Sequence, residues 1–335
     1  MIQKLGKYTL RFDRPPIIAS TAAVVGKKES EGPLGQHFDA SFDDPQLGQD
    51  SFEKAESLLQ QKALGAALDK ATLSPAQIET IFAGDLLNQC IGSAFGLREQ
   101  NIPFVGVYGA CSTFALALGL ASVFVASGAA EYTAALTSSH FCAAERQFRL
   151  PLEYGGQRTP NAQWTVTGAG AAILSRGGAG VGVCEATFGK MVDLGIKDVS
   201  NMGAAMAPAA ATTLIDYLND TGTKPDDFDL ILTGDLGFVG SELLVKLLKK
   251  DGFDIAPNHS DCGMLIFDRL EQDVHAGGSG CGCAATVVSG YIIKRMLAGE
   301  LKNVLFMATG ALMSPTSSLQ GESVPGIAHL VRLCV

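Results

Sequence analysis

The chain carries one pattern of secondary structure twice, and this duplication limits the folds that it can adopt. In the first copy, a helical segment and a turn lead into the apolar run 78–83 and then Gly84-Asp85-Leu86. In the second copy, a similar segment leads into the apolar run 228–233 and then Gly234-Asp235-Leu236, 150 residues later. Short apolar strands that alternate with helices are typical of parallel sheets with helices on both faces.

A second pair of matching segments extends the duplication over most of the chain. In each copy a long helix ends at a glycine, Gly128 or Gly299, and a further apolar strand follows. Internal repetition on this scale predicts two structural units of similar topology. We therefore predict an α/β protein with two halves, residues 1–175 and 176–335, packed into one compact pseudo-dimeric unit of five layers, αβαβα.

Composition and charge exclude several classes of protein. The 335 residues are 47% hydrophobic, which suffices for a large core, and the net charge of −9 disfavours nucleic acid and anionic lipid as partners. The longest apolar stretch, 114–130, is rich in Ala, Ser and Gly, so we expect a buried core helix rather than a membrane span. No secretory leader precedes the eight cysteines, which are expected to be reduced in a soluble protein of a cytosol-like compartment.

One motif connects this pattern to a known superfamily. Gly109-Ala110-Cys111-Ser112-Thr113 forms a turn that opens a long helix in the first half. Two tandem α/β halves with such a turn resemble the thiolase and ketoacyl-synthase superfamily, and the resemblance covers nearly the whole chain. Further blocks narrow the resemblance to the stage V sporulation protein AD family: 83–89, 137–140, 144–149, 153–157, 205–210, 259–263, 276–281 and 308–312.

The resemblance implies a binding protein rather than an enzyme. Proteins of this family bind dipicolinic acid, pyridine-2,6-dicarboxylate, and support its uptake into the forespore during sporulation and its release in germination. The ligand is expected to arrive as its calcium chelate, so no cofactor and no metal-ligating residues are predicted. The resemblance also implies a homodimer that other stage V sporulation proteins hold at the inner spore membrane.

Cys111 is the central candidate residue. It follows an apolar strand and begins a helix, where the helix dipole stabilises a thiolate or a bound anion, and it occupies the superfamily's nucleophile position. A condensing enzyme would place a His and an Asn at two later positions, which here read Gly234-Asp235 and Gly278-Ser279. For a thiolase, His275 approximates one partner, but the second thiol is missing. Both catalytic sets are therefore incomplete.

Two alternatives to a binding protein remain open. Cys111 could serve a cysteine-dependent acyltransferase or a ketoacyl-synthase-like condensing enzyme acting on coenzyme A thioesters, in which case an acyl thioester would acylate it rapidly. The chain could also be a structural member of a membrane complex with a vestigial pocket. Alanine at Cys111 or His259 would then leave dipicolinate uptake intact.

A polar cluster in the second half is predicted to contact the ligand. It contains His259, Asp261 and Cys262, and an imidazolium at His259 would pair with a ligand carboxylate. A solvated turn in which Asp261 caps its own loop explains the same pattern.

The Gly-rich turn with Ser279, Gly280 and Cys281 is the next candidate. It leads into a helix, so its backbone amides would cradle an anionic ligand. Close helix packing is the alternative explanation of its glycines. The spacing of Cys281 and Cys283 is too short for a zinc knuckle.

Two residues of the first half complete the predicted ligand set. Asp85 follows a buried strand, with Asp235 as its equivalent, and would orient the neighbouring thiol, meet ligand-borne calcium or simply cap its loop. His140 precedes a group of arginines in a stretch that builds pocket walls and dimer contacts in this superfamily, although arginines on a solvated loop are common. These arginines are Arg146, Arg149 and Arg158.

Overall fold

A computed structural model describes residues 1–148 and 158–335, so Arg149 and the family-like block 153–157 lie outside the described residues. The first sheet has the spatial order β3-β9-β7-β5-β6. In it, β5, β6 and β7 run parallel to one another, and β9 runs antiparallel to both of its neighbours. The strands are β3 (Ile17–Gly26), β5 (Thr80–Gly84), β6 (Phe104–Gly106), β7 (Tyr132–Ser139) and β9 (Gly168–Ser175).

The second sheet repeats this arrangement in the order β10-β15-β14-β11-β12. Again three strands are parallel, β11, β12 and β14, while β15 runs antiparallel to β10 and β14. The strands are β10 (Val181–Phe188), β11 (Leu230–Thr233), β12 (His259–Asp261), β14 (Asn303–Ala311) and β15 (Gly326–Cys334). The predicted duplication of one α/β topology is therefore confirmed.

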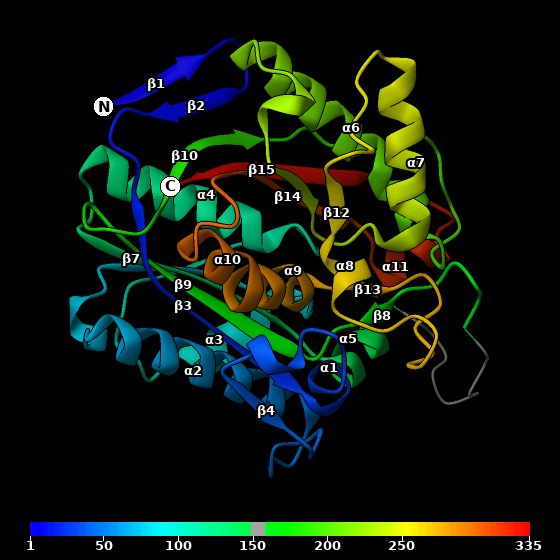
Figure 1. The fold of residues 1–335 in the computed structure, drawn as a ribbon. Coiled ribbons are helices and arrows are strands. Elements are labelled where there is room, and N and C mark those ends of the chain that lie inside the picture. The colour runs from blue at the N-terminus through cyan, green and yellow to red at the C-terminus, as the bar shows by residue number, and fades with distance from the viewer. Residues whose placement is uncertain (149–157) are drawn as a thin grey trace.

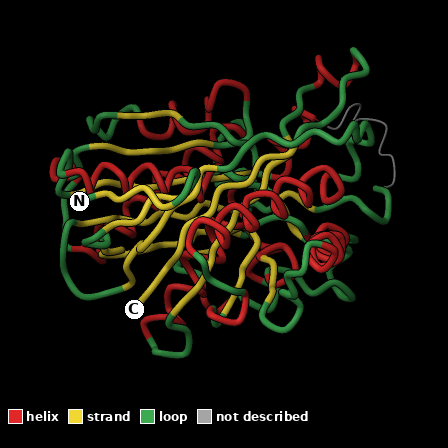
Figure 2. Tube along the Cα trace, turned by 90° about the horizontal axis from the view of Figure 1, so that it is seen from above, coloured by secondary structure: helices red, strands yellow, loops and turns green. Residues whose placement is uncertain are grey.

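The two sheets join where β10 meets β3. They pair antiparallel only at Val181 with Ile18 and at Gly182 with Ile17. A hairpin of β1 (Ile2–Leu5) and β2 (Thr9–Phe12) also pairs with β10, so the two chain ends lie at the same end of the molecule (Figures 1 and 2). The division of the chain at residue 175 stays a prediction.

Helices separate and cover the sheets to give five layers (Figure 1). The outer face of the first sheet packs on α2 (Phe52–Ala71), and that of the second packs on α6 (Met202–Thr221), which α7 (Gly237–Lys250) flanks. Between the sheets lie α4 (Thr113–Ser127) and α9 (Cys281–Val287). This is the predicted αβαβα thiolase-like fold.

The central position of α4 explains its composition. Residues 110–127 are long and apolar enough to cross a membrane, but 67% of this window is buried inside the fold. A helix that is apolar on every side suits a layer that contacts a sheet on both faces. The helix ends at Gly128, which has a φ of 83°, a left-handed conformation that glycine adopts without steric cost.

The expectation that every cysteine is reduced is wrong for one pair. Cys184 on β10 and Cys334 at the end of β15 form a disulfide, with 6.3 Å between their Cα atoms. The two residues are 150 positions apart in the sequence, and only the antiparallel pairing of β10 with β15 brings them together. The other six cysteines are free.

Candidate functional site

The Cys111 turn is a strained connection between β6 and α4. Ala110 has a φ of 50°, which is uncommon for a residue with a side chain. Two hydroxyls hold the turn: Ser112 Oγ donates to the Gly109 carbonyl at 2.6 Å, and Thr113 Oγ1 donates to the Ala110 carbonyl at 2.5 Å. Strain that is maintained by such local bonds is typical of functional sites.

A strand of the second half packs directly against this turn. A side chain added at Gly310 on β14 would place its Cβ 2.2 Å from the Gly109 carbonyl oxygen, so only glycine fits there. His329 on the neighbouring strand β15 lies behind the turn, and its Nδ1 accepts a hydrogen bond from the Gly189 N–H at 3.2 Å. Burial lowers the pKa of His329 to about 4, so this imidazole is neutral at pH 7.

Both halves line a small cavity beside the Cys111 thiol. Its volume is about 20 Å³, which is enough for roughly one water molecule. The cavity is therefore closed to a ligand larger than water, and the two flexible methionines on its wall, Met202 and Met313, are side chains that can rearrange. The lining residues are Leu86, Tyr108, Ala110, Cys111, Met202, Ser279, Ala311 and Met313.

The surroundings of Cys111 favour its neutral thiol. Burial raises the pKa of Cys111 and the nearby carboxyl of Asp235 raises it further, while the Gly280 N–H and the Ser279 hydroxyl, which lie near the sulfur, act in the opposite direction. No His, Lys or Arg is found among the described residues that line the cavity. Without a base the thiol is a weak nucleophile, although the two donors remain suited to an anion.

The Gly-rich turn meets the Cys111 turn, so two of the segments predicted to bind the ligand lie together. Ser279 lies in β13 (Gly278–Ser279), which pairs with β8 (Trp164–Thr165), and Gly280 has a φ of 104°. Cys281 packs in one apolar cluster with Cys111, and its thiol donates to the Ser138 carbonyl at 2.9 Å. The structure thus brings Cys111, Ser279 and Gly280 together, with Cys281 behind them.

The His259 cluster lies elsewhere, at the edge of the second sheet. His259 Nε2 is 3.0 Å from Thr233 Oγ1, and Asp261 accepts hydrogen bonds from this hydroxyl at 2.7 Å and from the Leu236 and Gly237 N–H groups at 2.9 Å. Burial lowers the pKa of His259 to about 4, so the imidazolium expected there is disfavoured. None of His259, Asp261 and Cys262 lines the cavity beside Cys111.

The two equivalent aspartates differ in their hydrogen bonds. Asp85 caps its own loop, because it accepts from the Leu87 N–H at 2.9 Å and from the N–H and hydroxyl of Ser93 at 2.7 and 2.6 Å. Asp235 is fully buried, and neither of its carboxyl oxygens has a hydrogen-bond partner in the described structure. Asp85, like Asp235, does not line the small cavity.

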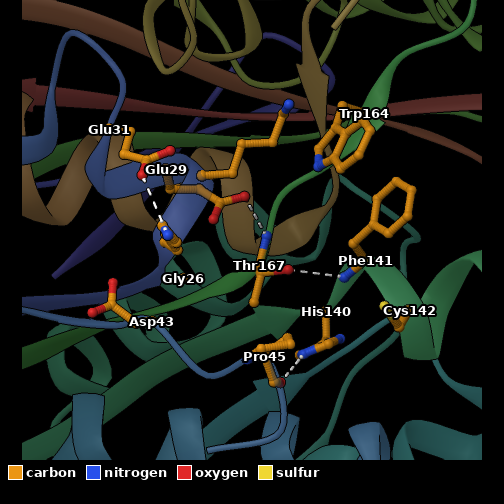
Figure 3. Close-up of a pocket in the computed structure, with 12 residues that line it drawn as sticks. Gly26, Glu29, Glu31, Asp43, Pro45, His140, Phe141, Cys142, Trp164 and Thr167 are labelled. Atoms are coloured by element: carbon orange, nitrogen blue, oxygen red, sulfur yellow. Dashed lines mark hydrogen bonds and ion pairs between the residues drawn. The ribbon is translucent and has the colours of Figure 1, made fainter. Parts of the chain in front are cut away.

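His140 lines a second, larger cavity of about 390 Å³ (Figure 3). Its Nε2 donates to the Pro45 carbonyl at 2.8 Å, and burial lowers the pKa of the imidazole. Arg158 lies near this cavity, where its guanidinium is 4.4 Å from the Trp164 ring centroid. Arg146 instead pairs with Glu53 at 2.8 Å on the surface.

Sequence reasoning missed the apolar walls of the Cys111 cavity, namely Leu86, Tyr108, Met202 and Met313. They come from four separate segments and look like ordinary core residues in the sequence. No pattern distinguishes an apolar side chain that faces a cavity from one that fills a core.

Comparison with known proteins gives one consistent answer. A sequence model of the family described as stage V sporulation protein AD (SpoVAD) matches residues 6–334. The chain is 45% identical over 324 residues to stage V sporulation protein AD of Bacillus subtilis (strain 168), which covers 97% of this chain and 96% of that protein.

Solved structures support the fold. The chain is similar to 3-oxoacyl-[acyl-carrier-protein] synthase III from Aquifex aeolicus VF5, with a TM-score of 0.57, 13% identity and coverage of 96% of this chain and 100% of that one. It is also similar to cerulenin-bound OleA of Xanthomonas campestris, with a TM-score of 0.61, 13% identity and coverage of 97% and 100%. At such low identity these likenesses concern the fold alone.

Proposed function

The chain belongs to the stage V sporulation protein AD family, and we propose that it binds dipicolinate, as the calcium chelate, in an opened form of the cavity beside Cys111. Binding would support the uptake of dipicolinate into the forespore during sporulation and its release in germination. The observation that carries this proposal is a site with donors for an anion and, among its described lining residues, no His, Lys or Arg to activate the thiol. The Ser279 hydroxyl and Gly280 N–H converge on Cys111, at the start of α4.

The same observation disfavours the condensing enzyme. A cysteine nucleophile needs a neighbouring base or cation to form its thiolate, and here the nearest charged group is the carboxyl of Asp235. An ionised Asp235 would repel a thiolate, and a protonated Asp235 cannot accept the thiol proton. The site is thus suited to recognition without bond making.

The proposed oligomer is a homodimer formed through β6. This strand ends the first sheet, and its side chains are exposed: Phe104 is 41% and Val105 38% accessible. An apolar edge strand with free backbone groups is a site for pairing with another chain. Because Tyr108 follows β6 and lines the Cys111 cavity, a second copy docked there would lie next to the ligand site. Val105→Lys should convert a dimer to a monomer in sedimentation experiments, and an unchanged mass would exclude this interface.

The partners proposed are other stage V sporulation proteins of a membrane complex in the spore. They would hold this chain at the inner spore membrane through protein contacts. Co-purification of the tagged chain from sporulating cells, with Val105→Lys as a comparison, tests this part separately from ligand binding.

Calorimetry with the purified chain tests the ligand. Dipicolinate should bind saturably, more tightly with calcium, and Ser279→Ala and Cys111→Ala should weaken binding about tenfold or more by removing groups at the cavity. Cys142→Ala, which removes a thiol from the other cavity, is the matched control and should bind as the parent does. No binding would refute the proposal, and rapid acylation of Cys111 by an acyl thioester would favour the enzyme instead.

A further inference from the structure

A second cavity in the first half has the size of a small-molecule site. Its volume is about 390 Å³, and it shares no lining residue with the Cys111 cavity. Sites for small ligands commonly have volumes of roughly 300–1,000 Å³. The walls come from α1 (Lys27–Ser30), the loop after β4 (Ala40–Phe42), the start of α5 (Phe141–Phe148), β8 and the segment that enters β9.

One wall of this cavity is aromatic. The Phe141 and Trp164 rings are stacked, with 3.9 Å between their centroids and 15° between their planes (Figure 3). Stacking holds both rings in place, so their exposed edges form a preformed apolar surface for a ligand.

A lysine side chain, Lys28, lies beside this aromatic wall. Lys28 Nζ lies 4.3 Å from the Trp164 ring centroid and also donates to the Gln272 carbonyl oxygen. It forms no ion pair with any described residue, and both burial and the charge of the nearby Arg158 lower the pKa of Lys28. The carboxyls of Glu29, Asp273 and Glu31 oppose this decrease only in part, so a ligand carboxylate beside Lys28 would stabilise its charged form further.

A carboxylate side chain, Asp43, lies on the other side of the cavity. Figure 3 shows Asp43 across the cavity from Phe141 and Trp164. Asp43 has no ion pair in the described structure, whereas its neighbour Glu31 pairs with Lys27 at 3.9 Å. The bond from His140 Nε2 to the Pro45 carbonyl ties the Asp43 loop to the start of α5. His140 is thus a positioning residue for this wall.

A third carboxyl is present but already satisfied. Glu29 is buried and accepts a hydrogen bond from the Thr167 N–H at 2.9 Å. Among the described residues that line the cavity, Lys28 and Asp43 are therefore a cation and an anion without ion pairs, and the apolar wall lies beside Lys28.

We propose that this cavity binds a small zwitterion of the amino-acid type with an apolar side chain, a free amino acid or a short peptide. Its carboxylate pairs with Lys28, its ammonium group is drawn toward Asp43, and its side chain packs against Phe141 and Trp164. Dipicolinate fits poorly, because it brings a second carboxylate toward Asp43 and lacks an ammonium group.

Tryptophan fluorescence reports on this cavity alone, because the sequence contains one tryptophan and that residue is Trp164. Leucine and the dipeptide Leu-Leu should each be titrated into the full chain. A saturable change in emission is expected from at least one of them. The compound that binds more tightly shows whether the cavity suits a single amino acid or a dipeptide. N-acetyl-leucine and leucine amide, which each lack one charge, should bind about 10- to 100-fold more weakly.

Two variants link each charge to its residue. Asp43→Asn should weaken binding of the zwitterion but leave binding of N-acetyl-leucine unchanged. Lys28→Gln should weaken binding of the zwitterion but leave binding of leucine amide unchanged. Lys62→Gln removes a lysine charge from an exposed position of α2 and is the control. A merely unfolded variant would lose all four ligands, so the selective pattern cannot arise from misfolding.

Three results would overturn this inference. They are the absence of a saturable change with either zwitterion, equal binding of the blocked analogues, and a response of Trp164 to dipicolinate in place of the zwitterions. Cys111→Ala should leave the Trp164 titration unchanged, so failure of the dipicolinate proposal and failure of this one are separate outcomes.

Discussion

Replacing Asp235 by asparagine should make the protein more stable at neutral pH. Asp235 is fully buried, and neither carboxyl oxygen has a hydrogen-bond partner in the described structure. The Cys283 thiol donates to the Gly234 carbonyl at 3.7 Å instead, and this thiol and the Thr309 N–H only partly oppose the rise in the pKa of Asp235. Burial, and then the neighbouring charge of Asp261, raise the pKa of Asp235 well above its ordinary value. The folded protein therefore holds a proton that the unfolded chain releases.

The size of the effect follows from this difference in proton binding. The stability associated with Asp235 is fully present below the pKa of the unfolded chain, about 3.9, and is lost as pH rises from there toward the folded pKa. The loss is about 1.4 kcal/mol for each pH unit over which the folded side chain stays protonated. Asparagine has nearly the same shape and no proton to lose. The difference in free energy of unfolding between Asp235→Asn and the parent should therefore increase with pH, by about 1.4 kcal/mol per pH unit, in favour of the variant.

Asp85→Asn is the matched control, because Asp85 occupies the equivalent place in the first half. Burial raises the pKa of Asp85 as well, but its carboxyl accepts three hydrogen bonds, from Leu87 and Ser93, so replacing an acceptor oxygen by an NH2 group should cost about 1.5–3 kcal/mol. Urea unfolding at several pH values between 5 and 8 measures both variants. Parallel stability curves for Asp235→Asn and the parent would refute the argument, as would a loss of stability as large as that of Asp85→Asn.

The remaining predictions concern the Cys111 turn and the disulfide. Iodoacetamide should alkylate Cys111 in the folded protein at pH 8 much more slowly than in urea, because burial raises its pKa; equal rates would show an activated thiol. Gly310→Ala should destabilise the fold by about 1–3 kcal/mol through the clash of its Cβ with the Gly109 carbonyl, measured by urea unfolding, with an unchanged midpoint as the contrary result. Mass spectrometry of a non-reduced digest should detect a Cys184–Cys334 linked peptide, and two unlinked peptides would contradict the pairing.

Part of the candidate site around Cys111 could be predicted from the sequence, and the part that could not has a structural cause. Cys111, Ser279 and Gly280 lie together, because the turns that contain them lead into α4 and α9, the two helices between the sheets. His259 was expected in the same pocket, but it lies on edge strand β12. There its alternation with Asp261 directs both side chains to Thr233 of the neighbouring strand.

The sequence by itself determined the fold class, the duplication and the identity of the thiol turn. These follow from local information: apolar periodicity, glycines at helix ends and a motif that is contiguous in the chain. Tertiary structure alone decided which apolar residues line the small cavity, that Cys184 meets Cys334, and that Asp85 is bonded while Asp235 is not. Each of these depends on strand register and layer packing between distant segments, and such contacts leave no signal in the sequence near either partner.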